Sequence, residues 1–328
     1  MRFASKLRQS FFVFAALTSL LLQACTGGGG GGGGANNTTP PQSTQSKEDI
    51  QNEFATRGFR ILEVGGAATE IHALDLTRDS LRQLLQQHPL PTGTTTVVCA
   101  TNGAQSFSIN DVNNNGVLDG GDIVTVTLQN CTDSGVTSNG TVVVKISQFT
   151  SASQVDNLIA DLTFTNFATV GTNGGNRLNG NVQATISRDF ALAANTCHTS
   201  TTDAVFNNLV VNKLSASGVV NSTMTISSGH FTNRSGVDCA FALKASGIVA
   251  SIDGLSGSLP IATSSEIFTD TDGIPYAGSY KLSGSLGQFL VTFNAAGNAI
   301  VQVDANNDGV YEETRFVKWS LFGGLSLP

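Results

Sequence analysis

Charged side chains are scarce in this sequence. Asp, Glu, Lys and Arg make up 12% of the 328 residues, and the chain has one Trp, two Met and three Tyr. Such a composition is untypical of a helical cytosolic enzyme, whereas abundant Gly, Ser, Thr and Asn are typical of a secreted β protein with many turns. The sequence also lacks a GxSxG elbow, an HExxH helix, a Walker loop and a GxGxxG after a strand. No known catalytic motif is therefore present, and we expect no enzyme activity.

Basic residues are outnumbered, so the formal net charge is −7. Three of the 17 basic residues and none of the 24 acidic ones precede Cys25, so a chain beginning at Cys25 carries −10. A body this acidic repels phosphate, which excludes nucleic acid as an expected partner. The four histidines are scattered, and we interpret them as surface or turn residues: His72, His88, His198 and His230.

The first residues form an export signal. Arg2, Lys6 and Arg8 precede the apolar run FFVFAALTSLLLQAC, which has the layout of a secretory signal peptide over residues 1–24. The apolar run from Phe11 to Leu22 is shorter than the ~20 residues that a membrane-spanning helix needs.

The end of this run, Leu22-Gln23-Ala24-Cys25, resembles the lipobox of bacterial lipoproteins. That resemblance implies cleavage before Cys25 and attachment of fatty acyl chains, such as palmitate, to its sulfur and to the new amine. Thr26 stands where an aspartate would imply retention in the inner membrane, so the resemblance implies an outer-membrane lipoprotein of Gram-negative type. The alternative is an ordinary signal peptide with a chance cysteine.

Residues 25–45 are a linker. Eight glycines, Gly27 to Gly34, are followed by ANNTTPPQSTQ, which has no apolar side chains to bury and is typical of a flexible tether. Lipid at Cys25 would make the membrane a partner and hold the folded body away from it.

Four further cysteines predict two disulfides. Cys99, Cys131, Cys197 and Cys239 are an even number in an exported chain, and no CxxC or zinc-finger spacing is present. Three pairings are possible. We favour Cys99–Cys131 and Cys197–Cys239, because each pair would join neighbouring strands.

The body divides by periodicity. Residues 46–90 predict short helices, with a capping box at Ser46 to Asp49 and a second start at Thr77. Residues 91–328 change to period two, as in Phe289, Val291 and Phe293, with Gly, Asn or Asp at the ends of each run. We therefore predict a mainly β fold: a large antiparallel meander, closed as a sandwich or curved into a partial barrel, with short N-terminal helices.

A weak repeat runs through this β region. Asn139-Gly140 and Asn179-Gly180 are forty residues apart, and three isoleucines, Ile146, Ile186 and Ile226, keep the same spacing. Similar short runs surround Asn130, Asn166 and Asn208. The repeat predicts stacked hairpins, although any long meander produces some internal similarity.

The run DVNNNGVLDGGD at 111–122 has the spacing of an EF-hand loop. Its calcium ligands would be the side chains of Asp111, Asn113, Asn115, Asp119 and Asp122 with the carbonyl of Val117, and Gly116 lies at the sharp turn. An aspartate at the twelfth position resembles the dockerin form of the loop. Strand-like QSFSI and IVTVTL flank it where that family has helices, so we expect the loop at the tip of a β-hairpin. The alternative is a plain Asn/Asp/Gly turn.

A second run, DANNDGVYEE, offers a shorter version of the same pattern. Its ligands would be Asp304, Asn306, Asp308, Glu312 and the carbonyl of Val310, while Arg315 at the twelfth position cannot bind a cation. Residues 273–328 around it loosely resemble a four-stranded module of exported Gram-negative lipoproteins, with an acidic turn before the last strand.

The sequence thus predicts an outer-membrane lipoprotein with structural calcium and a non-catalytic role in binding, adhesion or support of the envelope. Its partner would be an envelope protein or a glycan. The alternative is an envelope hydrolase whose site is assembled from residues distant in the sequence.

Overall fold

The computed structural model describes Gly58, Leu90 and residues 93–318, with gaps at 134, 153–154, 173, 190–199, 236–239, 253–257, 271–274, 285–286 and 296–297. The predicted signal peptide, the linker, Cys25, Cys197 and Cys239 lie outside the described residues. The same holds for the predicted helices of 46–90, apart from Gly58 and Leu90.

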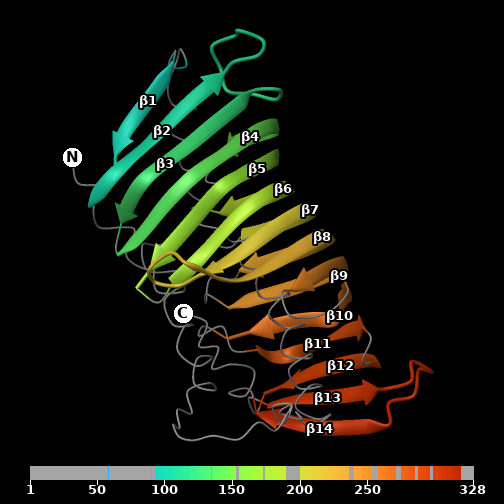
Figure 1. Ribbon diagram of the computed structural model, residues 1–328. Helices are drawn as coiled ribbons and strands as arrows, with labels where there is room; N and C mark the ends of the chain where they lie inside the picture. The colour runs from blue at the N-terminus through green and yellow to red at the C-terminus, as the bar shows by residue number, and fades with distance from the viewer. Residues whose placement is uncertain are drawn as a thin grey trace, which may run out of the picture.

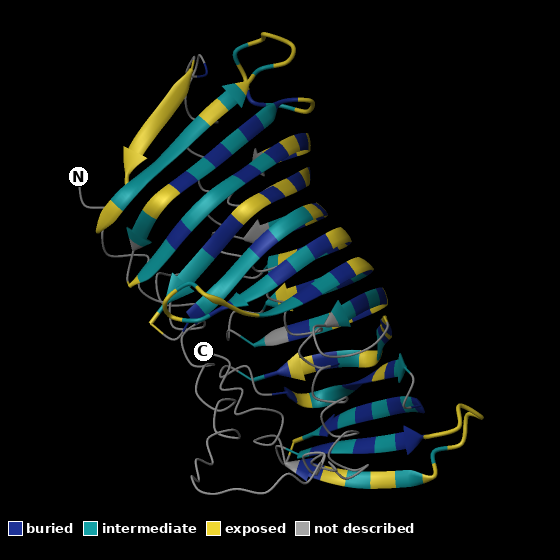
Figure 2. Ribbon diagram, viewed as in Figure 1, coloured by how far each residue is buried: buried dark blue, intermediate teal, exposed yellow. Residues whose placement is uncertain are grey.

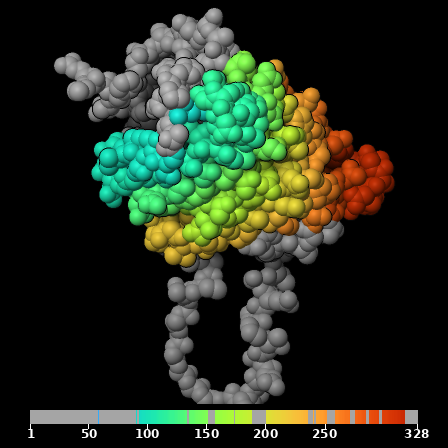
Figure 3. Space-filling model, turned by 90° about the horizontal axis from the view of Figure 1, so that it is seen from above, coloured from blue at the N-terminus to red at the C-terminus, as the bar shows by residue number. Residues whose placement is uncertain are grey.

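In the described part of the chain, fourteen antiparallel strands form one sheet in chain order, from β1 at one edge to β14 at the other (Figure 1). The space-filling view follows the same order from one side of the molecule to the other (Figure 3). The strands are β1 Thr94–Val98, β2 Asn102–Asn110, β3 Ile123–Asp133, β4 Val136–Ala152, β5 Val155–Gly171, β6 Gly174–Asp189, β7 Ser200–Leu214, β8 Val220–Ser235, β9 Phe241–Ile252, β10 Leu259–Thr269, β11 Pro275–Gly284, β12 Gly287–Asn294, β13 Asn298–Asp304 and β14 Glu313–Lys318.

The antiparallel meander is as predicted, and the sheet is open. The described strands make one sheet rather than the two of a sandwich, so the prediction of a sandwich is wrong. β1 does not pair with β14, and the alternative of a partial barrel, which is an open curved sheet, stays a prediction. Closure needs the register of the last strand to return to the first, and side-chain alternation carries no information about that.

Period-two patterning explains why these segments are strands. In β12 each second residue is buried, which places Phe289, Val291 and Phe293 on one face. Buried residues alternate with less buried ones along the other long strands as well (Figure 2). Because the buried residues are mostly apolar, the sheet has one apolar and one largely polar face. The three isoleucines of the repeat, Ile146, Ile186 and Ile226, all lie in the apolar core.

The Asn and Gly residues of the repeat lie at β-bulges. Gly140 of β4 faces two residues of β5, one of them Asn166, and Gly180 of β6 faces two residues of β7, one of them Asn208. Both glycines have positive φ, 107° and 124°, and so do the two asparagines, at 47° and 52°. The same arrangement joins Gly103 of β2 to Asn130 of β3. A bulge adds one residue to one strand and bends it, so each long strand turns at these places.

These glycines have no room for a side chain. A Cβ at Gly140 would lie less than 3.0 Å from the carbonyl oxygen of Asn166, and one at Gly180 would lie equally close to that of Asn208. The positive φ and the close backbone approach both require glycine. The repeat in the sequence is therefore the signature of a bend that recurs in successive strands.

A disulfide joins Cys99 and Cys131, with Cα atoms 5.4 Å apart, so this predicted pairing is confirmed. The reason given for this pairing, that it would join neighbouring strands, is wrong. Cys99 lies in the turn after β1 and Cys131 lies in β3, so the bond reaches past β2 instead of joining two neighbouring strands.

Gly58 and Leu90 both pack on the sheet. A Cβ at Gly58 would come within 2.6 Å of Leu282 and 3.3 Å of Tyr280, two core residues of β11. Leu90 is buried, and its N–H donates to the carbonyl of Gly116 at 3.2 Å.

The second candidate loop belongs to the same sheet, because it connects β13 to β14.

Candidate metal loops

The first acidic loop, residues 111–122, joins β2 to β3 at the tip of a hairpin, as expected from its flanking strands. Asp111 organises its first half: its carboxylate accepts the N–H of Asn115 at 3.2 Å and that of Gly116 at 2.7 Å. Asn113 Oδ1 accepts the N–H of Asn115 at 3.1 Å, and Asn115 Oδ1 accepts that of Val117 at 2.7 Å. Four predicted ligand positions therefore lie around one tight turn.

Asp119 faces the same turn from the other side. Its carboxylate accepts the side-chain amide of Asn115 at 2.6 Å and that of Asn113 at 3.1 and 3.2 Å. The predicted ligands Asp111, Asn113, Asn115 and Asp119 are thus brought together by the fold. Oxygen-rich loops of this kind suit calcium, which prefers oxygen ligands.

Asp122, the predicted ligand at the twelfth position, has a different set of contacts from these four residues. Its side chain is fully buried, and its two oxygens accept the N–H groups of Val112 at 3.0 Å and Asp119 at 2.9 Å. Its backbone also pairs with Ile146 of β4. Asp122 therefore closes the loop at its base through hydrogen bonds to both arms.

The second loop, between β13 and β14, repeats the four hydrogen bonds that side chains of the first loop accept from backbone N–H groups in its first half. Asp304 accepts the N–H of Asp308 at 3.2 Å and of Gly309 at 2.8 Å. Asn306 accepts the N–H of Asp308 at 2.9 Å, and Asp308 accepts that of Val310 at 2.8 Å. These are the bonds that positions one, three and five make in the first loop.

The backbone conformations match as well. The fourth position has φ of 55° at Asn114 and 61° at Asn307, and the sixth has 74° at Gly116 and 89° at Gly309. Two hairpin loops near opposite edges of the sheet thus share the backbone conformation of their first turn. The side chains of Val117 and Val310, at the seventh position of each loop, are both exposed.

The second loop also gathers three carboxylates. One ligand oxygen from each of Asp304, Asp308 and Glu312 lies within 4.8 Å of the others, and within the described part of the chain no other group of three acidic, His or Cys residues does so. Glu312 also accepts the N–H of Ala305 at 3.1 Å. Arg315, at the twelfth position, forms an ion pair with Glu313. The two charges therefore face each other rather than the loop. By sequence the first loop fits better, whereas by geometry the second concentrates more negative charge.

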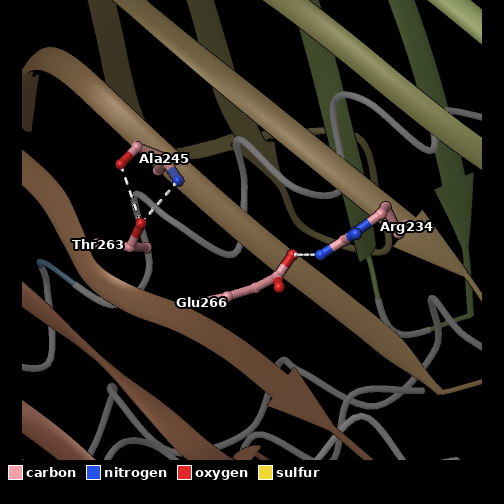
Figure 4. Close-up of polar contacts among 4 residues, drawn as sticks. All are labelled: Arg234, Ala245, Thr263 and Glu266. Atoms are coloured by element: carbon pink, nitrogen blue, oxygen red, sulfur yellow. Dashed lines mark hydrogen bonds and ion pairs between the residues drawn. The ribbon is translucent and has the colours of Figure 1, made fainter.

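Sequence reasoning missed a group of residues on the polar face. His230 Nε2 contacts the carboxylate of Asp203 on the neighbouring strand, 27 residues away. Arg234 of β8 forms an ion pair with Glu266 of β10 across β9 (Figure 4). Only the strand register brings these residues together, so no local signal could have found them.

The ion pair lies where β9 and β10 separate. Between their two paired regions the hydroxyl of Thr263 accepts the N–H of Ala245 at 3.0 Å and donates to its carbonyl at 3.1 Å (Figure 4). A side chain thus replaces the missing backbone bonds. Nearby, the exposed rings of Phe268 and Tyr276 lie 6.4 Å apart, so a charged pair and an aromatic pair share one region of the polar face.

A shallow hollow of about 440 Å³ lies between the ends of three hairpins. The described residues that line it are Gly, Thr, Ser, Ala and Val, such as Gly135, Thr137 and Ser217, and none of these described residues has an ionisable side chain.

No known protein family, curated protein or solved structure matches this chain. Within the part of the chain that the structure describes, no helix has the length and apolar character needed to cross a membrane.

Proposed function

We propose that the protein is an exported lipoprotein, anchored by acyl chains on Cys25 to the outer membrane, with a non-catalytic role in binding, adhesion or support of the envelope. The observation that carries the proposal is the sequence from Leu22 to Gly34, in which a lipobox is followed directly by a glycine tract. A folded sheet on a flexible, lipid-bearing leash is suited to contact with other envelope components.

The test is fractionation of cells that express the full chain. Cys25→Ala should move the mature protein from the membrane to the soluble fraction and remove labelling by a palmitate analogue. Cys239→Ala, which alters a cysteine outside the lipobox, is the matched control and should leave both unchanged. Membrane recovery of Cys25→Ala equal to that of the wild type would contradict the anchor.

We propose further that each acidic loop holds one calcium ion. Asp111, Asn113, Asn115, Asp119 and the Val117 carbonyl would bind the first ion, and Asp304, Asn306, Asp308, Glu312 and the Val310 carbonyl the second. All these ligand atoms are oxygens, the type that calcium prefers, and in the second loop one carboxylate oxygen from each of Asp304, Asp308 and Glu312 lies within 4.8 Å of the others. The ion would stiffen the hairpin tips rather than take part in chemistry.

The polar face is the surface for the binding role. Phe268 and Tyr276 are exposed there beside Arg234 and Glu266, and aromatic rings with charged groups are common at recognition sites. An envelope protein or a glycan is the kind of partner that such a surface suits. Tyr276→Ala should lower the capture of envelope components by the purified protein. Lys281→Ala, which changes an exposed residue outside the aromatic pair, is the control and should lower it less.

A second candidate is an envelope hydrolase assembled from residues distant in the sequence. The contact between Asp203 and His230 favours it, because a carboxylate that orients an imidazole is part of many acyl-transfer sites, and Ser246 lies opposite His230 in the register of β8 and β9. A fluorophosphonate probe should label Ser246 and fail to label Ser246→Ala if this candidate holds. Absence of labelling in the wild type would exclude a serine nucleophile at this place.

A further inference from the structure

The edge strand β1 is open to pairing on one side. It pairs with β2, and within the described residues it has no other neighbouring strand. All five of its residues, Thr94 to Val98, are exposed, and Val98 retains 81% of its accessible surface. An exposed strand edge presents unpaired backbone groups that another strand can bind.

The direction of these backbone groups follows from the neighbouring turn. The N–H of Cys99 donates to the carbonyl of Gly103 at 3.1 Å, so Cys99 directs its backbone groups to the β2 side. Because backbone groups alternate along a strand, Thr95 and Val97 also direct theirs to β2. Thr94, Thr96 and Val98 therefore direct their N–H and C=O groups to the free edge.

The two edges of the sheet differ in charge. β14 carries Glu313 and Arg315, and charged side chains on an edge strand oppose pairing with another chain. β1 has the sequence TTTVV and carries no charge. The disulfide between Cys99 and Cys131 ties its end to β3 and keeps the strand in place. β1 is thus fixed in place by the disulfide but lacks the charged side chains that oppose pairing at β14.

We propose that β1 pairs with β1 of a second copy of this chain, antiparallel and centred on Thr96. In this register Thr96 faces Thr96 of the second copy, and Thr94 faces Val98. All outward N–H and C=O groups of the three residues then find partners, and each facing pair consists of β-branched residues, which pack well across strands. The two sheets would become one continuous sheet with two-fold symmetry.

The expected association is weak. One five-residue strand covers much less than the roughly 800 Å² per partner of a standard stable interface. Copies tethered to one membrane, as in the proposed function, would meet at a higher local concentration, but the pairing itself does not depend on the anchor.

A covalent trap tests this pairing in the purified full chain. Facing residues of a hydrogen-bonded antiparallel pair have Cα atoms about 5.5 Å apart, within the range that a disulfide spans. Thr96→Cys should therefore give a reducible dimer at least several times more abundant than in the wild type, which controls for the native cysteines. Thr314→Cys, on the opposite edge, should stay at the wild-type level.

Other outcomes would overturn the proposal. Thr96→Cys that stays monomeric, or Thr314→Cys that dimerises equally, would exclude β1 as the specific edge. A disulfide that forms only when the two variants are mixed would indicate head-to-tail pairing of β1 with β14. A disulfide from Thr96→Cys in an envelope extract to a chain of another mass, in place of the dimer, would assign the edge to a different protein.

A pair of proline variants separates pairing from folding. Thr96→Pro removes an outward N–H and none that bonds to β2, so it should keep the melting temperature and lower self-association in sedimentation equilibrium at least about tenfold. Val97→Pro removes an N–H that bonds to β2 and should lower the melting temperature. Unchanged self-association of Thr96→Pro would overturn the proposal, and so would the reverse order of the two melting temperatures.

Discussion

The side-chain oxygen of Asn139 accepts the backbone N–H of Asn130 at 2.7 Å. The same bond, also of 2.7 Å, joins Asn179 to Asn166 two strands further on. In both pairs the donor is the bulged residue with positive φ, whose N–H has lost its place in the backbone ladder. An asparagine side chain thus satisfies a backbone group that the bend would leave without a protein partner.

Asn139→Ala should lower the free energy of unfolding by about 1 kcal/mol, the usual value of a hydrogen bond at a partly exposed site. Urea unfolding with a single transition measures it. Asn157→Ala, an exposed asparagine of β5 away from the bulges, is the matched control and should change the value by less than ~0.5 kcal/mol. Equal effects of the two variants would show that the bond does not stabilise the bend.

Gly140→Ala should be far more damaging than Gly121→Ala. Both glycines have nearly the same φ, 107° and 105°, so each alanine carries a similar backbone strain. Only at Gly140 does the new Cβ meet backbone, whereas at Gly121 nothing lies within 4 Å. The expected difference is roughly 2 kcal/mol or more in unfolding free energy, from the overpacking term alone. Similar losses at both positions would mean that the close approach is not what selects glycine.

Calcium should raise the melting temperature of the purified protein. With a dissociation constant on the order of 10⁻⁴ M, ~10 mM calcium is about a hundred times that constant and stabilises each loop by about 2.7 kcal/mol. That corresponds to a rise of roughly 5 to 10 °C per site in a domain of this size, measured by differential scanning fluorimetry.

The loops can be separated by substitution. Asp111→Ala and Asp304→Ala should each remove about half of the rise, and the double variant should remove all of it. Asp161→Ala, an exposed aspartate of β5, is the control and should keep the full response. If chelation with EGTA leaves the melting temperature unchanged, the loops are plain hairpin turns.

If Cys25 is acylated as proposed, Thr26→Asp should hold the protein in the inner membrane, because the residue after the acylated cysteine governs onward export in the lipoproteins that the Leu22 to Cys25 run resembles. Sucrose-gradient separation of the two membranes provides the measurement. Thr26→Ala makes a change of similar size without the charge and should stay in the outer-membrane fraction. Co-migration of Thr26→Asp with the outer membrane would contradict the sorting signal.

The features that could be predicted from the sequence depend on residues close together in the chain, and the others depend on the partner strand. Alternation such as Phe289, Val291 and Phe293 identifies a strand from its own residues, because burial on one face requires period two. The hairpin position of the 111–122 loop follows equally from its flanks. The Asn and Gly repeat was visible as well, but its meaning was not: a bulge is a mismatch of two residues against one, and the partner strand is needed to count it.

What the sequence by itself indicated is local: the alternation of strands such as β12, the turns that end them, a favoured pairing of Cys99 with Cys131, and two similar acidic loops. Only the tertiary structure decided that the strands form one open sheet, that Asp203 meets His230 and Arg234 meets Glu266, and that β1 is left as an uncharged edge. The reason is physical. Backbone conformation and side-chain alternation act over a few residues, whereas register and closure depend on how far each strand slides against its neighbour, and many positions along the chain contribute to that together.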